Sequence, residues 1–236
     1  MRMRFSVLIT SALLFNGASL AGQTPAGAIA LYPFDGTVDN TENRSLTGGI
    51  ESGPTFVDGL HGQALRLGAR DPATFFSLDA AGLPLGPNHD FSVQFWMRSE
   101  TDADHRFVLL SQKEFVDNSL ASQKNPGWVF YSSGGTWAWS MGSGDRRITY
   151  ERDNGSRMPL NDGRWHQLTM TYSSARSEVR LFYDGVNWVS YKVMDSDGFD
   201  FGNAAPLVAG WDGREAGPAP EILPGIREGA DQLQRL

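Results

Sequence analysis

The chain has 236 residues, of which 40% are hydrophobic and 11% aromatic; this composition fits one domain with a large core and excludes a disordered or fibrous chain. The formal net charge of -7 is spread along the sequence, so a nucleic-acid partner is not expected. The sequence contains no cysteine, which excludes disulfides, thiolate catalysis and thiolate metal sites.

Residues 1–21 have the pattern of a secretory signal peptide. Two arginines precede an apolar run from Phe5 to Phe15, and Ser19 and Ala21 take the small-residue positions before a cleavage point. A short buried helix is the alternative interpretation of this run. No later apolar run in the sequence is long enough to span a bilayer. We therefore expect an exported protein, secreted or periplasmic, with no membrane span once the signal is removed.

Residues 26–212 consist of short apolar or alternating segments separated by turn residues, which is the pattern of a two-sheet β-sandwich. The clearest alternation is in Phe91–Arg98, where Phe91, Val93, Phe95 and Met97 fall on one face of the predicted strand. No segment before Pro220 has a helical period. The predicted strands are Ala28–Phe34, Leu65–Leu67, Thr74–Leu78, Phe91–Arg98 (the clearest), Phe107–Ser111, Gly127–Tyr131, Thr136–Met141, Arg146–Glu151, two within Asn161–Gly185, Asn187–Val193 and Pro206–Trp211.

The segment Asn161–Gly185 predicts a long antiparallel hairpin with an Asp-Gly turn at each end. Trp165 and His166 stand at the head of its first strand. No carboxylate in the sequence is arranged to orient His166, so we interpret this residue as a hydrogen-bonded histidine of the sheet, not a catalytic base. We interpret Trp165 as a core residue.

Residues 213–236 differ from the rest of the chain. A Gly-Pro-Ala-Pro sequence at 217–220 breaks regular structure, and apolar residues then recur at helical spacing up to Leu236. This tail is predicted to be a linker or a short amphipathic helix.

The predicted strands resemble the laminin-G-like domains of the concanavalin A-like lectin and glucanase superfamily, particularly the bacterial secreted type. The resemblance implies a jelly-roll sandwich of two curved antiparallel sheets. It also implies a ligand-binding or adhesive module for glycans or proteins, often with one calcium ion at the sheet rim and often attached to a secreted hydrolase. The matching segments are Leu31–Gly36, Gly62–Leu67, Phe91–Arg98, Gly127–Val129, Asp162–Tyr172 and Leu181–Gly185.

The end of the chain departs from this family. Members usually close with a strand of the approximate sequence Gly-x-Ile-Asp-Glu-Val that pairs with the N-terminal strand, and nothing after Trp211 matches it. We expect the closing C-terminal strand to be missing: either the tail from Glu221 replaces it, or the chain is part of a longer protein. An unpaired edge beside Ala28–Phe34 would favour aggregation.

Three tryptophans are candidate ligand-binding residues. Trp137 and Trp139 share a face of one predicted strand, and Trp128 lies on the partner strand. A flat indole surface stacks on the apolar face of a sugar ring, but large aromatic residues also fill cores. Solvent exposure distinguishes the two roles.

For calcium, the family's acidic N-terminal loop corresponds to Asp35, Asp39 and Asn40. A second acidic loop runs from Asp195 to Asp200. Carboxylate and amide oxygens suit calcium, yet Asp and Asn also favour turns without a metal. Calcium is thus a candidate cofactor, with turn formation as the alternative.

No pair of carboxylates has the spacing that glucanases of the superfamily place on one strand. Glu100, Asp102 and Asp104 fit a solvated polar loop, and Glu178 begins a strand without a second carboxylate. The sequence therefore favours a secreted, non-catalytic binding module for a glycan or an extracellular protein. The alternatives are a structural N-terminal module of a larger exported hydrolase, with a downstream catalytic domain as partner, and a divergent glycosidase.

Overall fold

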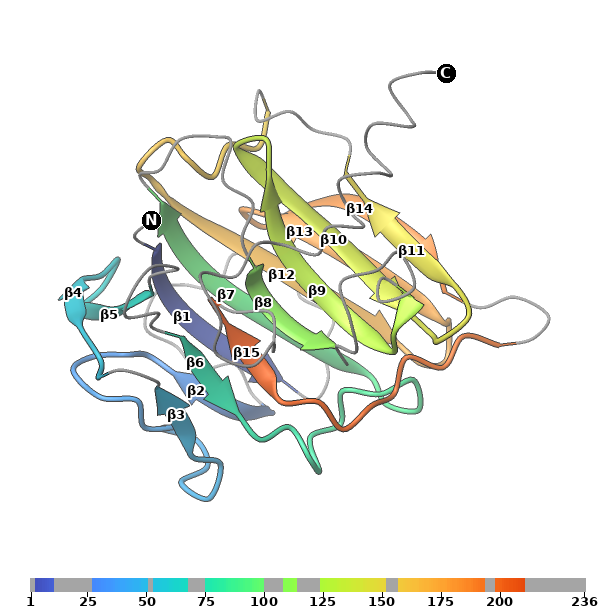
Figure 1. The fold of residues 1–236 in the computed structure, drawn as a ribbon, viewed down its shortest axis with the longest axis horizontal. Helices are drawn as coiled ribbons and strands as arrows, with labels where there is room; N and C mark the ends of the chain where they lie inside the picture. The colour runs from blue at the N-terminus through green and yellow to red at the C-terminus, as the bar shows by residue number, and fades with distance from the viewer. Residues whose placement is uncertain are drawn as a thin grey trace.

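The structure is a computed structural model, and it describes residues 3–10, 27–50, 53–67, 75–99, 108–113, 124–151, 157–193 and 198–210. For residues 3–10 only the backbone is described. The regular elements in these ranges are β-strands, which form two antiparallel sheets stacked face to face (Figure 1). The predicted all-β sandwich is confirmed. The predicted tail at 213–236 lies outside the described residues.

The first sheet has eight strands, in the order β14-β13-β12-β7-β1-β5-β4, with β2 paired beside β1. Its central strand β7 carries the clearest alternation of the sequence, and the odd-numbered residues from 91 to 97 all point into the core. The bounds are β1 (Met3–Thr10), β2 (Ala28–Tyr32), β4 (Phe56–Asp58), β5 (Gln63–Leu67), β7 (Phe91–Ser99), β12 (Trp165–Ser173), β13 (Glu178–Tyr183) and β14 (Val186–Lys192).

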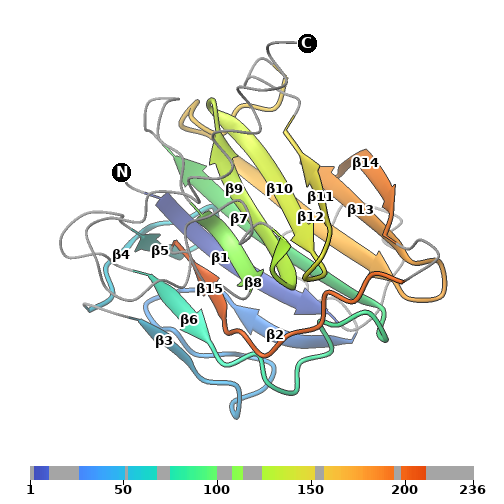
Figure 2. The ribbon, with the colours of Figure 1, turned by 45° about the vertical axis from the view of Figure 1, so that its right-hand side comes forward.

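The second sheet has seven strands, in the order β11-β10-β9-β8-β15-β6-β3. It lies over the first sheet, as Figure 2 shows from a second direction. The hairpin formed by residues 127–142 of this sheet turns at Gly134 and Gly135. Both glycines have positive φ, which allows the sharp reversal. The bounds are β3 (Gly48–Ile50), β6 (Phe76–Leu78), β8 (Val108–Lys113), β9 (Gly127–Ser133), β10 (Thr136–Gly142), β11 (Arg147–Tyr150) and β15 (Leu207–Ala209).

Aromatic side chains fill the space between the sheets. The ring of Phe95 on β7 meets Phe130 on β9 edge to face, with centroids 5.4 Å apart. Trp139 on β10 stacks on Tyr191 of β14, with centroids 6.1 Å apart and planes 11° apart. Burial of each such side chain stabilises the fold by about 1.5–3 kcal/mol, so these contacts fix how the two sheets pack.

The middle strands of the seven-stranded sheet are buried on both faces. All six residues of β8 and all seven of β10 are buried. A second apolar cluster, separate from the main core, is formed by residues of these strands: Val108, Val129, Tyr131 and Ala138. A sheet with only one buried face would expose one side of these strands, so the middle strands of this sheet have little contact with solvent on either face.

Strand β1 lies within the first sheet. It pairs with β7 along its whole length, and on its other side with β5 and then β2. The edge beside β2, which the sequence predicted to be unpaired, is thus paired here with residues from the predicted signal peptide. These residues form a strand and not the buried helix given as the alternative interpretation.

Candidate functional site

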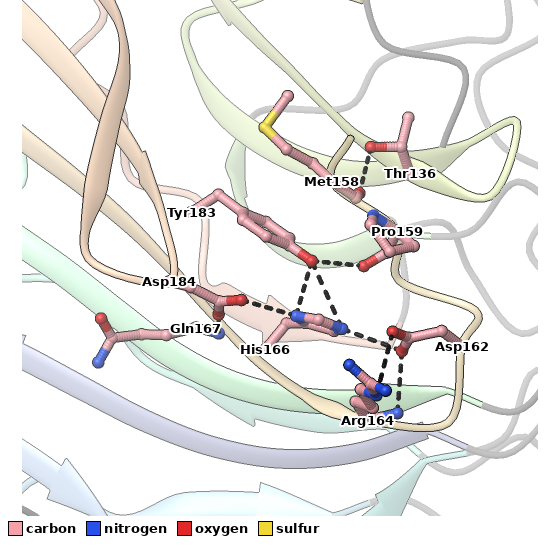
Figure 3. A network of polar contacts seen from close by, with 9 residues as sticks. All are labelled: Thr136, Met158, Pro159, Asp162, Arg164, His166, Gln167, Tyr183 and Asp184. Carbon is pink, nitrogen blue, oxygen red and sulfur yellow. Dashed lines mark hydrogen bonds and ion pairs between the residues drawn. The ribbon is translucent and has the colours of Figure 1, made fainter. Parts of the chain in front are cut away.

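The two Asp-Gly turns of the predicted hairpin come together around His166 (Figure 3). Its Nδ1 lies 2.9 Å from Oδ2 of Asp184, and its Nε2 lies 3.0 Å from Oδ1 of Asp162. Tyr183 stacks on the imidazole, and its hydroxyl lies 2.7 Å from Nδ1. The expectation that no carboxylate orients His166 is therefore wrong, because Asp162, four residues before it, and Asp184, eighteen residues after it, each supply one.

The electrostatics of this cluster favour a charged imidazole. Burial of the His166 ring opposes protonation, but hydrogen bonds to Asp184 and Asp162, together with their charges, outweigh it and raise its pKa. Burial likewise opposes the charge of Asp162, yet the hydrogen bonds from His166 and the backbone N–H of Arg164 lower the pKa of that carboxyl. Because both ring nitrogens face carboxylates, neither is free to take a proton from a substrate.

The same cluster ties the two sheets together. The Tyr183 hydroxyl donates to the carbonyl oxygen of Pro159 at 2.8 Å. The next residue, Leu160, donates its N–H to the carbonyl of Gly135 in the β9–β10 turn, and Thr136 donates its hydroxyl to Met158 at 2.6 Å. His166 thus acts as a structural histidine, as the sequence predicted, and the motif that contains it holds one end of the sandwich.

The three candidate tryptophans lie in the core. Trp128, Trp137 and Trp139 each have 0% of their surface exposed. A sugar ring cannot stack on an indole without exposed area, so the sugar-platform role does not fit these positions and the core role does. The physical reason is strand parity: Trp137, Trp139 and Met141 alternate as an all-apolar set, and such a set faces the interior.

A different tryptophan is exposed. Among the described residues, the large hydrophobic side chains with substantial exposure are Val186 (56%), Trp188 (42%) and Leu60 (42%). Val186 and Trp188 both belong to β14, which forms the outer edge of the eight-stranded sheet. Of the described strands, β14 is the one that carries exposed large hydrophobic side chains.

A β-bulge presents Trp188. Phe182 of β13 pairs with Asn187 and Leu181 pairs with Val189, so Trp188 is the extra residue on β14. The side-chain amide of Asn187 donates to the carbonyl oxygens of both Leu181 and Val189 at 3.0 Å. These two bonds hold the bulge, and the bulge directs the indole away from the core.

Polar side chains adjoin Trp188. Ser190, two residues further along β14, lies directly opposite Arg180 of β13. Nε of Arg180 lies 2.7 Å from Glu178, and this hydrogen bond, more than any other influence, lowers the pKa of that carboxyl. Lys192 lies 3.8 Å from the same carboxylate. We call the group formed by Trp188, Ser190, Arg180 and Glu178 the β14 surface.

Sequence reasoning did not find Trp188, although a signal was present. Val189, Tyr191 and Val193 form the apolar alternation of this segment. Trp188 therefore falls on the polar parity with Ser190 and Lys192, which predicts an outward side chain.

The residues of the predicted calcium loop make other contacts. Oδ1 of Asn40 accepts the backbone N–H groups of Leu31, Glu42 and Asn43 at 2.9, 3.0 and 3.3 Å. Oδ1 of Asp35 accepts the N–H of Gln63 at 2.9 Å. Asp39 donates its own N–H to Thr37. These contacts match the turn-forming role of Asp and Asn.

The calcium role of Asp35, Asp39 and Asn40 stays a prediction. No group of three or more His, Asp or Glu residues that could hold a metal ion occurs within the described ranges. Of the second acidic loop, Asp200 accepts the N–H of Gly202 at 2.8 Å, whereas Asp195 and Asp197 lie outside the described residues. Glu100, Asp102 and Asp104 also lie outside them.

The buried lysine of β8 was not anticipated. Nζ of Lys113 donates to the carbonyl of Asn125 at 2.7 Å, and only 6% of the residue is exposed. Burial, with a smaller contribution from the charge of Arg147, lowers the pKa of Lys113 to about 7. This lysine has the environment of an interior group, in contrast to the charged residues of the β14 surface.

Solved structures that are similar in fold include toxin binding domains. The binding domain of Paraclostridial mosquitocidal protein 1 is 16% identical, with a TM-score of 0.60 over 76% of this chain and 42% of that one. The binding domain of botulinum neurotoxin serotype G is 12% identical, with a TM-score of 0.55 over 83% and 48%. The binding domain of botulinum neurotoxin DC, solved in complex with SialylT, is 13% identical, with a TM-score of 0.52 over 74% and 41%.

The chain therefore corresponds to less than half the length of each of these domains. The comparison with curated proteins finds no match. Within the described part of the chain, no helix is long and apolar enough to cross a membrane.

A family model matches residues 73–220, which is more than half of the sequence. The match includes both strands of the His166 hairpin and the bulged strand β14. This chain belongs to the concanavalin A-like lectin/glucanases superfamily.

Proposed function

We propose that the chain is a non-catalytic binding module and that the β14 surface contacts a glycan. The observation that carries the proposal is Trp188, an exposed indole that a bulge and the Asn187 side chain hold at the sheet edge. Its surroundings supply what a sugar requires. The indole face offers an apolar platform for the C–H face of a ring, and Ser190, Arg180 and Glu178, further along the same edge, offer donors and acceptors for hydroxyl groups.

The same geometry gives no support to hydrolysis. A glycosidase needs two carboxyl groups across a cleft, one of them protonated at neutral pH. On the β14 surface the single carboxylate, Glu178, has a lowered pKa and is bound by Arg180. His166 is engaged at both nitrogens. These residues therefore bind and position, and they supply no acid–base pair.

Glycan-array binding with the parent and Trp188→Ala tests the proposal. We expect binding at least about tenfold weaker in the variant, because the aromatic anchor of a small interface dominates its energy. Trp188→Phe retains a ring and should keep part of the affinity. Leu60→Ala is a matched control, since Leu60 has the same exposed fraction as Trp188 and lies in the β4–β5 turn.

Equal binding by the parent and Trp188→Ala would refute the glycan role of the β14 surface. An edge strand also suits a protein partner. Retention of an extracellular protein in a pull-down, lost in Trp188→Ala without any array signal, would assign the same surface to protein recognition instead.

Calcium is not required by this proposal, because the oxygens of Asp35 and Asn40 already accept backbone N–H groups. Glycan binding should be equal in calcium and in EDTA. Loss of binding in EDTA would instead support the calcium site predicted at Asp35, Asp39 and Asn40. Export of the module, and its attachment to a larger hydrolase, rest on residues 1–21 and on the family resemblance, respectively.

A further inference from the structure

The outer face of the eight-stranded sheet carries aromatic side chains that do not belong to the core. Trp96 on β7, Trp165 on β12 and Phe182 on β13 are each half-buried, whereas the residues that alternate with them along these strands are buried. None of the three is among the partly buried residues that pack against the core. The expectation that Trp165 is a core residue is therefore wrong, because its side chain falls on the outward parity of β12.

The strand register places two of these rings close together. Arg98 of β7 lies opposite Trp165 of β12, and Trp96, two residues before Arg98, lies opposite Gln167. Directly opposed residues share a face of the sheet, and diagonal neighbours are within reach of long side chains. The guanidinium carbon of Arg98 lies 5.8 Å from the centroid of the Trp165 ring, and this cation–π contact fixes the ring on the face.

The same face continues to the β14 surface. Phe182 of β13 lies opposite Thr169 of β12 on one side and Asn187 of β14 on the other. The bulge places Trp188 beside Asn187, on the same side of the sheet as Phe182. β14, β13, β12 and β7 are consecutive in the sheet, so the rings extend over about 14 Å at the usual strand spacing. We call Trp188, Phe182, Trp96 and Trp165 the aromatic strip.

Uncharged amide groups lie between the rings of the aromatic strip. Gln94 of β7 lies opposite Thr169, and Gln167 of β12 lies opposite Trp96. Figure 3 shows the Gln167 side chain pointing away from His166. Among the described residues, the side-chain amides of Gln94 and Gln167 have no hydrogen-bond partner. Each amide can therefore both donate and accept a hydrogen bond at this face.

We propose that the aromatic strip extends the β14 surface and that the module binds an extended, uncharged oligosaccharide several rings long. This proposal rests on the proposed glycan function. Successive sugar rings would place their C–H faces on Trp188 and Trp96 and their hydroxyl groups on Gln94 and Gln167. The row of rings is longer than one sugar, so a single terminal sugar would use only part of it.

The position of the strip favours a glycan as its occupant. The backbone groups of β12 and β13 are already paired with neighbouring strands, so a peptide cannot add to the sheet here and recognition depends on side chains. These side chains are separate aromatic rings and neutral amides, which match the apolar faces and hydroxyl groups of sugars. Of the outward residues of β7 and β12, Arg98 is the one that carries a charge, which suits a neutral chain.

Calorimetry with oligosaccharides of increasing length tests the proposal. The probes are cello-, manno- and xylo-oligosaccharides of two, four and six units, because β-1,4-linked chains are extended. For at least one series we expect the hexasaccharide to bind the parent at least about tenfold more tightly than the disaccharide. Trp96→Ala should lose this gain and keep the disaccharide affinity, whereas Trp188→Ala should weaken binding at every length.

A second variant and a second measurement keep the test valid if Trp96→Ala does not fold. Gln167→Leu retains the size of a half-buried side chain but removes its amide, so it should reduce the gain with length. In the parent labelled with 5-fluorotryptophan, fluorine NMR resolves the seven tryptophans, and Trp→Phe variants assign them. The hexasaccharide should shift the signals of Trp96, Trp165 and Trp188, while those of the three core tryptophans serve as internal controls.

The outcomes separate this proposal from the glycan function of the β14 surface. If Trp188→Ala weakens binding while affinity does not depend on length and the Trp96 signal stays in place, the strip is overturned and the β14 surface stands. If the gain with length is lost in Trp96→Ala but Trp188→Ala binds as the parent does, the strip is supported and the role of Trp188 is refuted. No gain with length in any series overturns the strip, as does a protein partner lost in Trp96→Ala without an oligosaccharide signal.

Discussion

The two sheets of the sandwich place tryptophans and titratable side chains in different environments. In the seven-stranded sheet, Trp137 and Trp139 are fully buried and Lys113 has a pKa lowered to about 7. In the eight-stranded sheet, Trp188 is exposed and His166 has a raised pKa. The seven-stranded sheet is buried on both faces of its middle strands, whereas the eight-stranded sheet ends in a bulged edge. Residue type alone therefore does not predict whether a side chain is exposed; its parity and its place in the sheet do.

The largest expected effect is on a buried tryptophan. Trp139→Ala should lower the free energy of unfolding by about 3–5 kcal/mol, because it removes a core indole that stacks on Tyr191 of the facing sheet. Trp188→Ala should change it by less than about 0.5 kcal/mol. Urea denaturation followed by circular dichroism measures both. Similar losses in the two variants would break the contrast between the sheets.

Lys113→Met should show the next largest effect, and it depends on pH. The folded chain releases the Lys113 proton near pH 7, whereas an unfolded lysine keeps it to about 10.4, so stability rises with pH between these values. The cost of the buried charge, on the order of a few kcal/mol, is present in full below that window. The stability of Lys113→Met relative to the parent should therefore increase as pH falls from about 9 to about 6.

A pH-independent difference between Lys113→Met and the parent would contradict the lowered pKa. The hydrogen bond to Asn125 that the variant loses adds only a constant offset, since the carbonyl acceptor does not titrate.

Asn187→Ala should cost about 1 kcal/mol, because two carbonyl groups at the bulge lose their donor but remain near water. The more informative readout is glycan binding, which should weaken even though Trp188 is intact. Ser190→Ala is the matched control for stability, since its hydroxyl donates only to Asn187 among the contacts described, at 3.3 Å. Unchanged binding in Asn187→Ala would show that the bulge does not orient the indole.

His166 should show the smallest pH-dependent change in the free energy of unfolding, and the slope of this change with pH should be opposite to that of Lys113. Its raised pKa contributes stability that is complete below the unfolded value of about 6.5 and is lost as pH rises through the higher folded value. The stability difference between the parent and His166→Gln should therefore shrink from about pH 6 to about pH 9. A difference that grows over this range would mean that the imidazole is neutral in the fold.

The fold class could be predicted from the sequence because the patterns that indicate it lie within short segments. The alternation of Phe91–Arg98 fixes which face of β7 is buried, and the Asp-Gly turns fix the ends of the β12–β13 hairpin. Asp184 and Gly185 both have positive φ, as a two-residue hairpin turn requires.

The His166 cluster was harder to predict because it combines a local and a non-local contact. Asp162 lies four residues before His166, whereas Asp184 reaches the same ring only when the turn at the far end of the hairpin folds onto the same end of the sheet. The alternation of apolar residues around the core tryptophans predicts their burial. They were considered as binding residues because indoles can stack on sugar rings. The strand at Met3–Thr10 could not be anticipated, since its sequence also satisfies the rules for a leader.

The exposure of Trp188 has an optical consequence. Indoles in a dry core emit at shorter wavelengths than an indole in contact with water, and among the described tryptophans Trp188 is the most exposed. A water-soluble collisional quencher such as iodide reaches such a residue first. The chain thus carries its own fluorescent reporter at the β14 surface, and an occupant of that surface can be followed without a label.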